Sequence, residues 1–173
     1  MRNVILVTVL GAMCANGQGS RPAAAPAPKA ATDDFLGAIR NNDLKSIRSQ
    51  LRRHALTQAM DARGATALMY ASLYADPTCV KLLLDKGADT NVSDAAGATA
   101  LMWAAGNPEK LRLLLAHGAN VNARAKSGRT ALIMAASVTG NIKAVRLLLD
   151  RGADFKVGRE SGAGALWAHA GGV

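Results

Sequence analysis

The sequence predicts an all-α solenoid, in which short helical units stack along one axis. Three near-copies of one phrase, Gly-x-Thr-Ala-Leu followed by Met or Ile, begin at Gly64, Gly97 and Gly128, spaced 33 and 31 residues apart. Each phrase is followed by three consecutive leucines and then by Gly-Ala-Asp or Gly-Ala-Asn. A fixed period of this size is typical of repeat proteins, whose units bury their apolar faces only against their neighbours. Function is therefore expected on an elongated surface rather than in one pocket.

The composition fits a single domain of small, closely packed helices. The chain has 173 residues, of which 50% are hydrophobic and only 3% aromatic. Its formal net charge is +9, and much of the excess lies near the C-terminal end, where residues 124–159 hold eight Lys or Arg and two Asp. A basic end of this kind favours contact with an acidic protein or an anionic surface. The alternative for many of these charges is a scattered, solvated face.

The first 19 residues resemble a secretory signal peptide. Arg2 gives a short positive start, residues 4–13 are uncharged and mostly apolar, and small residues suited to a signal peptidase follow. An apolar run of this length is too short to span a bilayer, which takes about 20 residues. We therefore expect an exported protein, periplasmic or extracellular. The alternative is a short buried or frayed N-terminal helix.

Cys14 raises the alternative of a lipoprotein, whose signal ends at a cysteine that becomes lipidated. That signal normally carries Leu three residues before the cysteine and a small residue immediately before it, but this chain has Gly11 and Met13 there. Lipidation is therefore disfavoured. The other cysteine, Cys79, then has no partner and is expected to pack as a small hydrophobe. Residues 20–32, rich in alanine with three prolines, are expected to form an extended linker.

The unit at residues 61–93 shows how each repeat is built. Gly64 predicts a turn with a positive φ, and Thr66 is placed to cap a short first helix. Pro77 predicts the start of a second helix, because proline at the first helical position loses no hydrogen bond. Gly87 ends that helix. The predicted order is turn, helix, helix, loop.

This order and these residues resemble the ankyrin repeat. The family pattern runs from a Gly-x-Thr-Pro-Leu-His turn and helix, through a Val-Val-x-Leu-Leu-Leu helix, to a Gly-Ala-Asp-Val-Asn-Ala loop, and the resemblance covers residues 33–173. It implies an ankyrin-repeat solenoid of stacked helix-turn-helix units joined by β-turn loops. The expected organisation is a signal peptide at 1–19, a linker at 20–32, an N-terminal capping repeat at 33–60, repeats at 61–93, 94–124 (two residues short) and 125–157, and a partial repeat at 158–173.

Departures from the family pattern carry structural expectations. Alanine replaces the usual proline, and Met69 and its counterparts replace the histidine, so the hydrogen bonds of that histidine are expected to be absent and apolar contact to supply the stability. The second repeat lacks two residues after Ala105, which predicts a shorter first helix and a local notch in the groove. In the cap, Ser49 and Gln50 stand where an internal repeat carries leucines, which predicts a face open to water.

Near the end of the sequence, residues 162–168 begin a further repeat whose second helix is missing. Either Trp167 and this first helix cover the apolar side of residues 145–149, or the sequence is the leading part of a longer chain.

The sequence shows no motif of an enzyme, cofactor or metal site. The histidines, His54, His117 and His169, fall in different units, and no His-x-x-x-His, paired-cysteine, phosphate-binding glycine or nucleophile-elbow motif is present. We therefore expect a protein that is not an enzyme and that holds neither cofactor nor metal.

The ankyrin resemblance implies that a partner contacts the turn tips and the inner face of the first helices. Aromatic residues and arginine dominate contact energies, which draws attention to Tyr70, Tyr74 and Trp103. The alternative is that Tyr70 and Trp103 only fill the space between repeats. The expected partner-binding residues are Arg63, Tyr70, Leu73, Tyr74, Ala96, Ala98, Trp103, Lys126, Ser127 and Arg129. Other positions that match the family's contact positions are Ala62, Ala65, Ala95, Ser137 and Val138.

The predicted function is protein–protein interaction, as a scaffold, inhibitor or assembly factor of the bacterial envelope. One alternative is an N-terminal docking or regulatory arm of a larger exported enzyme, and another is an effector delivered into a host cell. The basic tips at Lys126 and Arg129 favour an acidic protein or an anionic envelope surface as partner. Export and the scarcity of stacking aromatics disfavour nucleic acid. Membrane contact requires lipidation of Cys14 or basic residues, and the sequence leaves the oligomeric state open.

Overall fold

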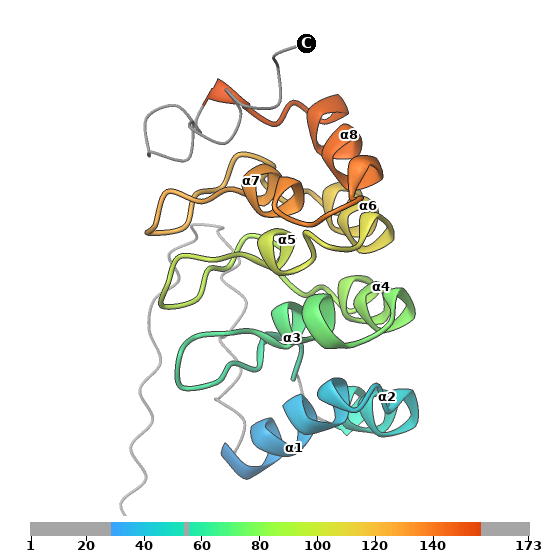
Figure 1. The fold of residues 1–173 in the computed structure, drawn as a ribbon. Helices are drawn as coiled ribbons and strands as arrows, with labels where there is room; N and C mark the ends of the chain where they lie inside the picture. Colours follow the sequence, from blue (N-terminus) through green and yellow to red (C-terminus); the bar gives the residue numbers. More distant parts are fainter. Residues whose placement is uncertain (1–28, 54–55, 157–173) are drawn as a thin grey trace, which may run out of the picture.

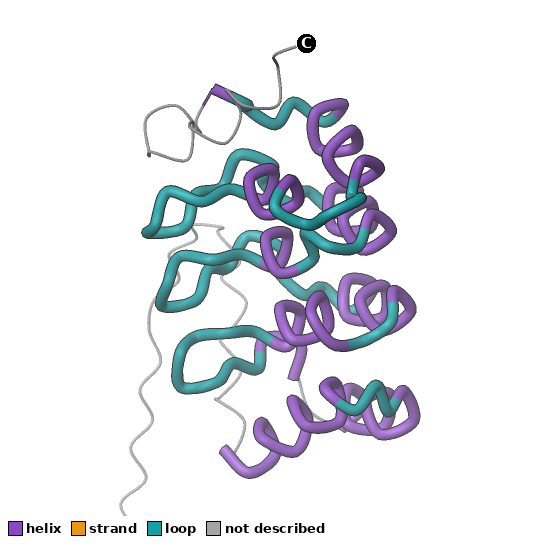
Figure 2. The backbone as a smooth tube through the Cα atoms, viewed as in Figure 1, coloured by secondary structure: helices purple, strands orange, loops and turns teal. Residues whose placement is uncertain are grey.

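The computed structural model describes residues 29–53 and 56–156, and this part of the chain forms a stack of paired helices. Figure 1 shows the first helices α1, α3, α5 and α7 in one row and the second helices α2, α4, α6 and α8 in an outer row beside it. Long loops project from the first row, away from the outer row (Figure 2). The all-α fold is confirmed. The elements are α1 (Lys29–Arg40), α2 (Leu44–Arg53), the 3₁₀ turn η1 (Leu56–Gln58), α3 (Ala67–Tyr74), α4 (Pro77–Asp85), α5 (Ala100–Trp103), α6 (Pro108–Ala116), α7 (Ala131–Ala136) and α8 (Ile142–Asp150).

The core runs continuously between the two rows. Each first helix packs on the next along the stack, and α4, α6 and α8 pack on one another in the same way. In α3 every residue from Ala67 to Ser72 is buried, as expected of a short helix that is apolar on all sides. The outer helix α2 is the exception in its row, because it packs on α1 and η1 rather than on α4.

The threonine of the repeated phrase caps the first helix in two repeats, as predicted for Thr66. Oγ1 of Thr66 accepts a hydrogen bond from the backbone N–H of Met69, and Oγ1 of Thr130 accepts one from Ile133, both at 3.3 Å. The backbone N–H of Thr66 in turn donates to the sulfur of Met69 at 3.4 Å. The thioether is a weak acceptor, so Met69 adds a local hydrogen bond to its apolar contacts, within its own repeat rather than to a neighbouring turn.

Adjacent turn tips are held together through the backbone. The N–H of Ala95 donates to the carbonyl of Arg63 at 2.8 Å, and the N–H of Lys126 donates to the carbonyl of Ala96 at 2.9 Å. The turns approach so closely that a Cβ on Gly97, whose φ is +76°, would lie 2.9 Å from the nitrogen of Lys126. Glycine is therefore required at this position both for its backbone conformation and for the space it leaves.

Asparagine side chains tie the loops that follow α4 and α6 to the equivalent loop of the next repeat. Nδ2 of Asn91 donates to the carbonyl of Gly118 at 3.0 Å, and Oδ1 accepts from the N–H of Asn120 at 2.8 Å. Asn122 makes the same pair of bonds to the following repeat, at 3.1 and 2.8 Å. These bonds fix the spacing of successive loops along the stack.

The structure corrects one predicted boundary. Helix α1 begins at Lys29 and so occupies the last four residues of the stretch at 20–32 that was expected to be an extended linker. Pro28 is the last proline of that stretch, so nothing prevents a helix from starting at the next residue. The signal peptide with Cys14, the rest of the linker, and residues 158–173 with Trp167 lie outside the described residues.

Candidate partner-binding surface

An aspartate at the first position of the turn builds the tips of the first two repeats. Oδ1 of Asp61 accepts hydrogen bonds from the backbone N–H groups of Arg63 and Ala65, both at 2.8 Å. Asp94 holds the second turn in the same way, at 2.8 and 2.9 Å. The third turn begins instead with Ala125, whose methyl group cannot accept a hydrogen bond. The tips that present Arg63 and the second-repeat alanines are therefore held by side-chain hydrogen bonds that the third tip lacks.

Asp61 also joins its turn to the helix behind it. Its Oδ2 accepts a hydrogen bond from the hydroxyl of Tyr70 at 2.9 Å and pairs with Nε of Arg63 at 3.3 Å. Burial alone would raise the pKa of this carboxyl, but the hydrogen bonds from Ala65, Tyr70 and Arg63 outweigh burial and hold the pKa below its usual range. Asp61 is thus ionised and fully engaged at neutral pH.

An aromatic cluster lies behind the first turn and joins three first helices. The ring of Tyr70 stacks on Tyr74 at a centroid distance of 6.1 Å and packs against Trp103 at 6.0 Å with a tilt of 54°. The guanidinium of Arg40, at the end of α1, lies 5.1 Å from the centroid of the same ring. Pairs of this geometry add stability beyond simple burial. Tyr70 therefore contacts every other member of the cluster, and its ring holds Tyr74 and Trp103 in place.

The structure corrects the placement of Tyr70 as a contact residue. Its side chain is only 5% exposed, so it fills the space between repeats, which was the alternative interpretation. Its neighbours differ, because Tyr74 is 53% exposed and Leu73 49% exposed, while Trp103 is half-buried. Tyr70 supports the surface from beneath, whereas Leu73 and Tyr74 form it.

The remaining predicted residues divide by position. Those at the turn tips are exposed, and Ala98, at the base of the second turn, is half-buried. Its counterpart in the first turn, Ala65, is buried, which corrects its placement as a contact residue. The loops that carry the turns lie in successive layers of the stack (Figure 2), and the exposed residues at their tips form a rim. The exposed tip residues are Arg63, Ala96, Lys126, Ser127 and Arg129.

The short second repeat explains why large apolar side chains are exposed here. Helix α5 has four residues and α3 has eight, as expected from the two missing residues, so α5 is about 6 Å shorter at 1.5 Å per residue. When the repeated phrases are aligned, Leu73 and Tyr74 correspond to Ser137 and Val138, and the second repeat has no counterpart to them. Val138 is 44% exposed. The missing pair thus leaves apolar side chains on both flanking repeats without a neighbour between them.

Sequence reasoning missed Lys110, which stabilises this surface from within. Its side chain is buried, and Nζ donates to the carbonyls of Ala71 and Ser72 at 3.3 and 3.0 Å, in the last turn of α3 just before Leu73 and Tyr74. Burial lowers the pKa of this ammonium group. Alignment of the repeats indicates this burial, because the residues at the same position in two other repeats, Cys79 and Ala144, are small and fully buried.

The described part of the chain shows neither a cluster of metal ligands nor a membrane-spanning helix. In residues 29–53 and 56–156 no three His, Cys, Asp or Glu side chains come together as metal ligands, and no helix there is long and apolar enough to cross a membrane. Cys79 is completely buried, as predicted, and its pKa is raised by that burial to about 11. His117 is exposed, with Nδ1 2.9 Å from the carbonyl of Leu113.

Comparison with known families agrees with this architecture. A family model for ankyrin repeats, in three copies, matches residues 35–125 and again residues 97–159. No curated protein matches the chain in a sequence comparison. The family match covers most of the described stack, including every turn and first helix that carries the candidate surface. The chain therefore belongs to the ankyrin-repeat family.

Proposed function

We propose that this protein is a non-catalytic binding module that holds a protein partner on the surface formed by the first helices and turn tips. Ankyrin repeats generally serve as protein–protein interaction modules. The observation that carries the proposal for this chain is the exposure of Leu73 and Tyr74 on a buried support. Exposed apolar residues that gather in one place mark interaction sites, whereas scattered ones do not.

The support matters because binding is stronger when the contact residues are already ordered. Tyr74 stacks on Tyr70, and the carbonyls beneath Leu73 are held by Lys110, so a partner loses little free energy in fixing these side chains. An aromatic residue on a rigid base is the usual form of an interface hot spot, where truncation costs roughly 2 kcal/mol or more. We place the hot spot at Leu73, Tyr74 and Trp103.

The rim indicates the chemistry of the partner. Arg63, Lys126 and Arg129 are exposed at the tips, and the third turn has no carboxylate at its first position to offset its two cations. Complementary charge on a partner raises the rate of association and sets its orientation. We therefore propose a partner that carries an apolar side chain for the aromatic cluster and acidic residues toward the tips.

The proposed setting is the bacterial envelope, where the module would act as a scaffold, inhibitor or assembly factor. The support for this is the apolar run at residues 4–13, followed by small residues, at the start of the chain. Sequencing the N-terminus of the protein recovered from a periplasmic fraction tests it. A mature N-terminus between residues 14 and 20 is expected, and an intact Met1 in the cytoplasmic fraction would contradict export.

Affinity capture from an envelope extract of the source organism tests the binding surface. The variant Leu73→Ala/Tyr74→Ala is compared with Ile142→Ala/Leu149→Ala, which removes two other exposed apolar side chains, at α8. A protein retained by the unaltered chain and by the α8 variant, but lost with the Leu73/Tyr74 variant, is the expected result. Retention that depends on α8 instead would move the binding site to the other end of the stack.

A further inference from the structure

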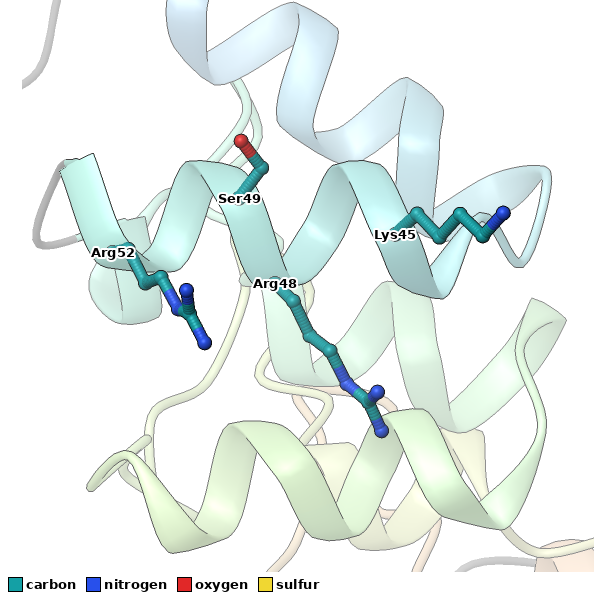
Figure 3. A pocket seen from close by; sticks show the side chains of 4 residues that line it. All are labelled: Lys45, Arg48, Ser49 and Arg52. Carbon is teal, nitrogen blue, oxygen red and sulfur yellow. The ribbon is translucent and has the colours of Figure 1, made fainter.

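The outer face of α2 carries a basic hollow that the proposed function does not use. Lys45, Arg48, Ser49 and Arg52 line an open depression of about 340 Å³ along this helix (Figure 3). Figure 3 shows Arg48 and Arg52 extending in the same direction from one side of α2, with Lys45 beyond them toward the N-terminal end. All three cations are exposed.

The hollow exists because α2 lacks the leucines that close the outer row elsewhere. Ser49 and Gln50 stand where α4 has Leu82 and Leu83, and α2 does not pack on α4 as α4 packs on α6. The sequence predicted a face open to water at this cap. The structure adds that the open face is lined by cations, which a solvated cap does not require.

These cations are not neutralised by their surroundings. Helix α2 contains no acidic residue, and the described residues include no ion pair to Lys45, Arg48 or Arg52. Asp43 precedes the helix and accepts hydrogen bonds from the Ser46 hydroxyl and from the N–H groups of Ser46 and Lys45. Its carboxylate also interacts with the charge of Lys45 and so offsets part of it, but it forms no ion pair with Arg48 or Arg52. Like charges three and four residues apart destabilise a helix. A bound anion would relieve that repulsion.

The basic surface continues along the outer row. The residue aligned with Arg48 is a cation in every outer helix, and each of these residues is exposed. Asp85, Glu109 and Asp150 accompany the later helices, and Lys81 is paired with Asp85 at 2.8 Å, so the unopposed charge is greatest at α2. Packed helices lie about 10 Å apart, which sets the spacing of the aligned cations from α4 to α8. The aligned residues are Arg48, Lys81, Arg112 and Arg146.

The kinds of side chain on this face indicate which class of ligand it can bind. Helices α2, α4 and α6 carry none of the exposed large hydrophobic residues of the described ranges, whereas α8 carries Ile142 and Leu149. A protein partner therefore finds no apolar anchor on the part of the face centred on α2. The described aromatic residues lie elsewhere too, so nucleic-acid bases find nothing on which to stack. An extended anionic surface needs neither anchors nor stacking, because each nearby Lys or Arg adds its own share of attraction.

We propose that the outer face of the stack, centred on Lys45, Arg48 and Arg52, binds the phosphate headgroups of an anionic lipid membrane. This surface lies opposite the turn tips, so membrane contact leaves the partner-binding surface free (Figure 1). The proposal does not depend on the proposed function, because a different face carries it.

Flotation of the full chain with lipid vesicles tests the proposal. Vesicles of equal parts phosphatidylglycerol and phosphatidylcholine are compared with vesicles of phosphatidylcholine alone, in low and high salt. The variant Lys45→Gln/Arg48→Gln/Arg52→Gln is set against Lys86→Gln/Arg124→Gln/Arg151→Gln, which removes the same charge from exposed loop and helix-end positions away from the aligned cations. Thermal unfolding confirms that both variants fold. The apolar N-terminal residues are common to all samples and contribute equally.

The expected result is binding to the phosphatidylglycerol vesicles that falls with salt and weakens by about 100-fold in the α2 variant. The control variant should lose less than about threefold. Equal losses in the two variants would overturn the proposal in favour of a general effect of net charge. Absence of vesicle binding, together with α2-dependent binding to a DNA duplex in a parallel gel-shift assay, would overturn it in favour of nucleic acid.

Discussion

Single buried polar residues stabilise the candidate surface from beneath. Lys110 donates to the carbonyls of Ala71 and Ser72, and Cys79, whose pKa it lowers in opposition to burial, packs in the same region. Tyr70 links the turn at Asp61 to the aromatic rings. All three residues are buried, and Lys110 and Tyr70 hold residues of the candidate surface in place. Replacing them should therefore change the free energy of unfolding, and the effects of Lys110 and Cys79 can be measured separately.

Replacing Lys110 with alanine should lower the free energy of unfolding by about 2–4 kcal/mol. The change leaves two carbonyls of α3 without their buried donor and removes the packed side-chain stem. Urea unfolding measures it, with Arg112→Ala on the exposed side of the same helix as the control, for which a change within about 0.5 kcal/mol is expected. A Lys110 variant as stable as the control would show that the ammonium group is dispensable.

Cys79 should make stability fall in alkaline solution. Burial raises its pKa from 9.0 to about 11, so between these values the thiol ionises in the unfolded chain before it ionises in the fold. Its contribution is therefore complete below pH 9 and is lost as the pH approaches 11, by about 2 kcal/mol. Unfolding from pH 8 to 11, compared with Cys79→Ala, isolates this term because other groups titrate in both proteins. Parallel pH profiles would contradict the assigned burial.

At the scale of the helix, the three copies of the repeated phrase are not equivalent. Thr66 and Thr130 cap their helices through the side chain, but Oγ1 of Thr99 is buried and finds no partner among the described residues. The short α5 follows this uncapped threonine. The sequence predicts the shortening from the missing residues, but the aligned threonines give no sign that one of them is unsatisfied.

Substitution of the three threonines by valine should separate these roles. Thr66→Val and Thr130→Val each remove a cap and should cost about 1 kcal/mol. Thr99→Val removes a buried hydroxyl that has no hydrogen bond, so it should be neutral or stabilising by up to about 1 kcal/mol. Equilibrium unfolding of the three variants measures the differences. An equal cost at all three positions would mean that Thr99 also forms a cap in solution.

At the scale of the whole molecule, the repeated phrases predict the order of turns and helices because glycine, threonine and leucine recur at fixed offsets. They do not predict which variable residue turns inward. Tyr70 and Tyr74 lie one helical turn apart and look alike in the sequence, but one is buried and the other is exposed. Lys110 is charged, which argues for exposure, and only its hydrogen bonds to a neighbouring repeat explain its burial. Such contacts depend on how two repeats meet, which a single repeat does not contain.

The stack therefore presents two faces with different chemistry. The first-helix face is apolar and braced at Leu73 and Tyr74, and the outer face is basic at Arg48 and its aligned cations. The central claim is that a protein partner binds the first face.

Site-specific photo-crosslinking in living cells tests that claim most directly, because it captures a partner of any identity where the two proteins meet. A benzophenone side chain is placed at Tyr74, at Leu73, or at the exposed outer-face residue Thr78. Positions 73 and 74 should each give a discrete cross-linked protein, and position 78 should give none. The same band from position 78, with none from 73 or 74, would contradict it.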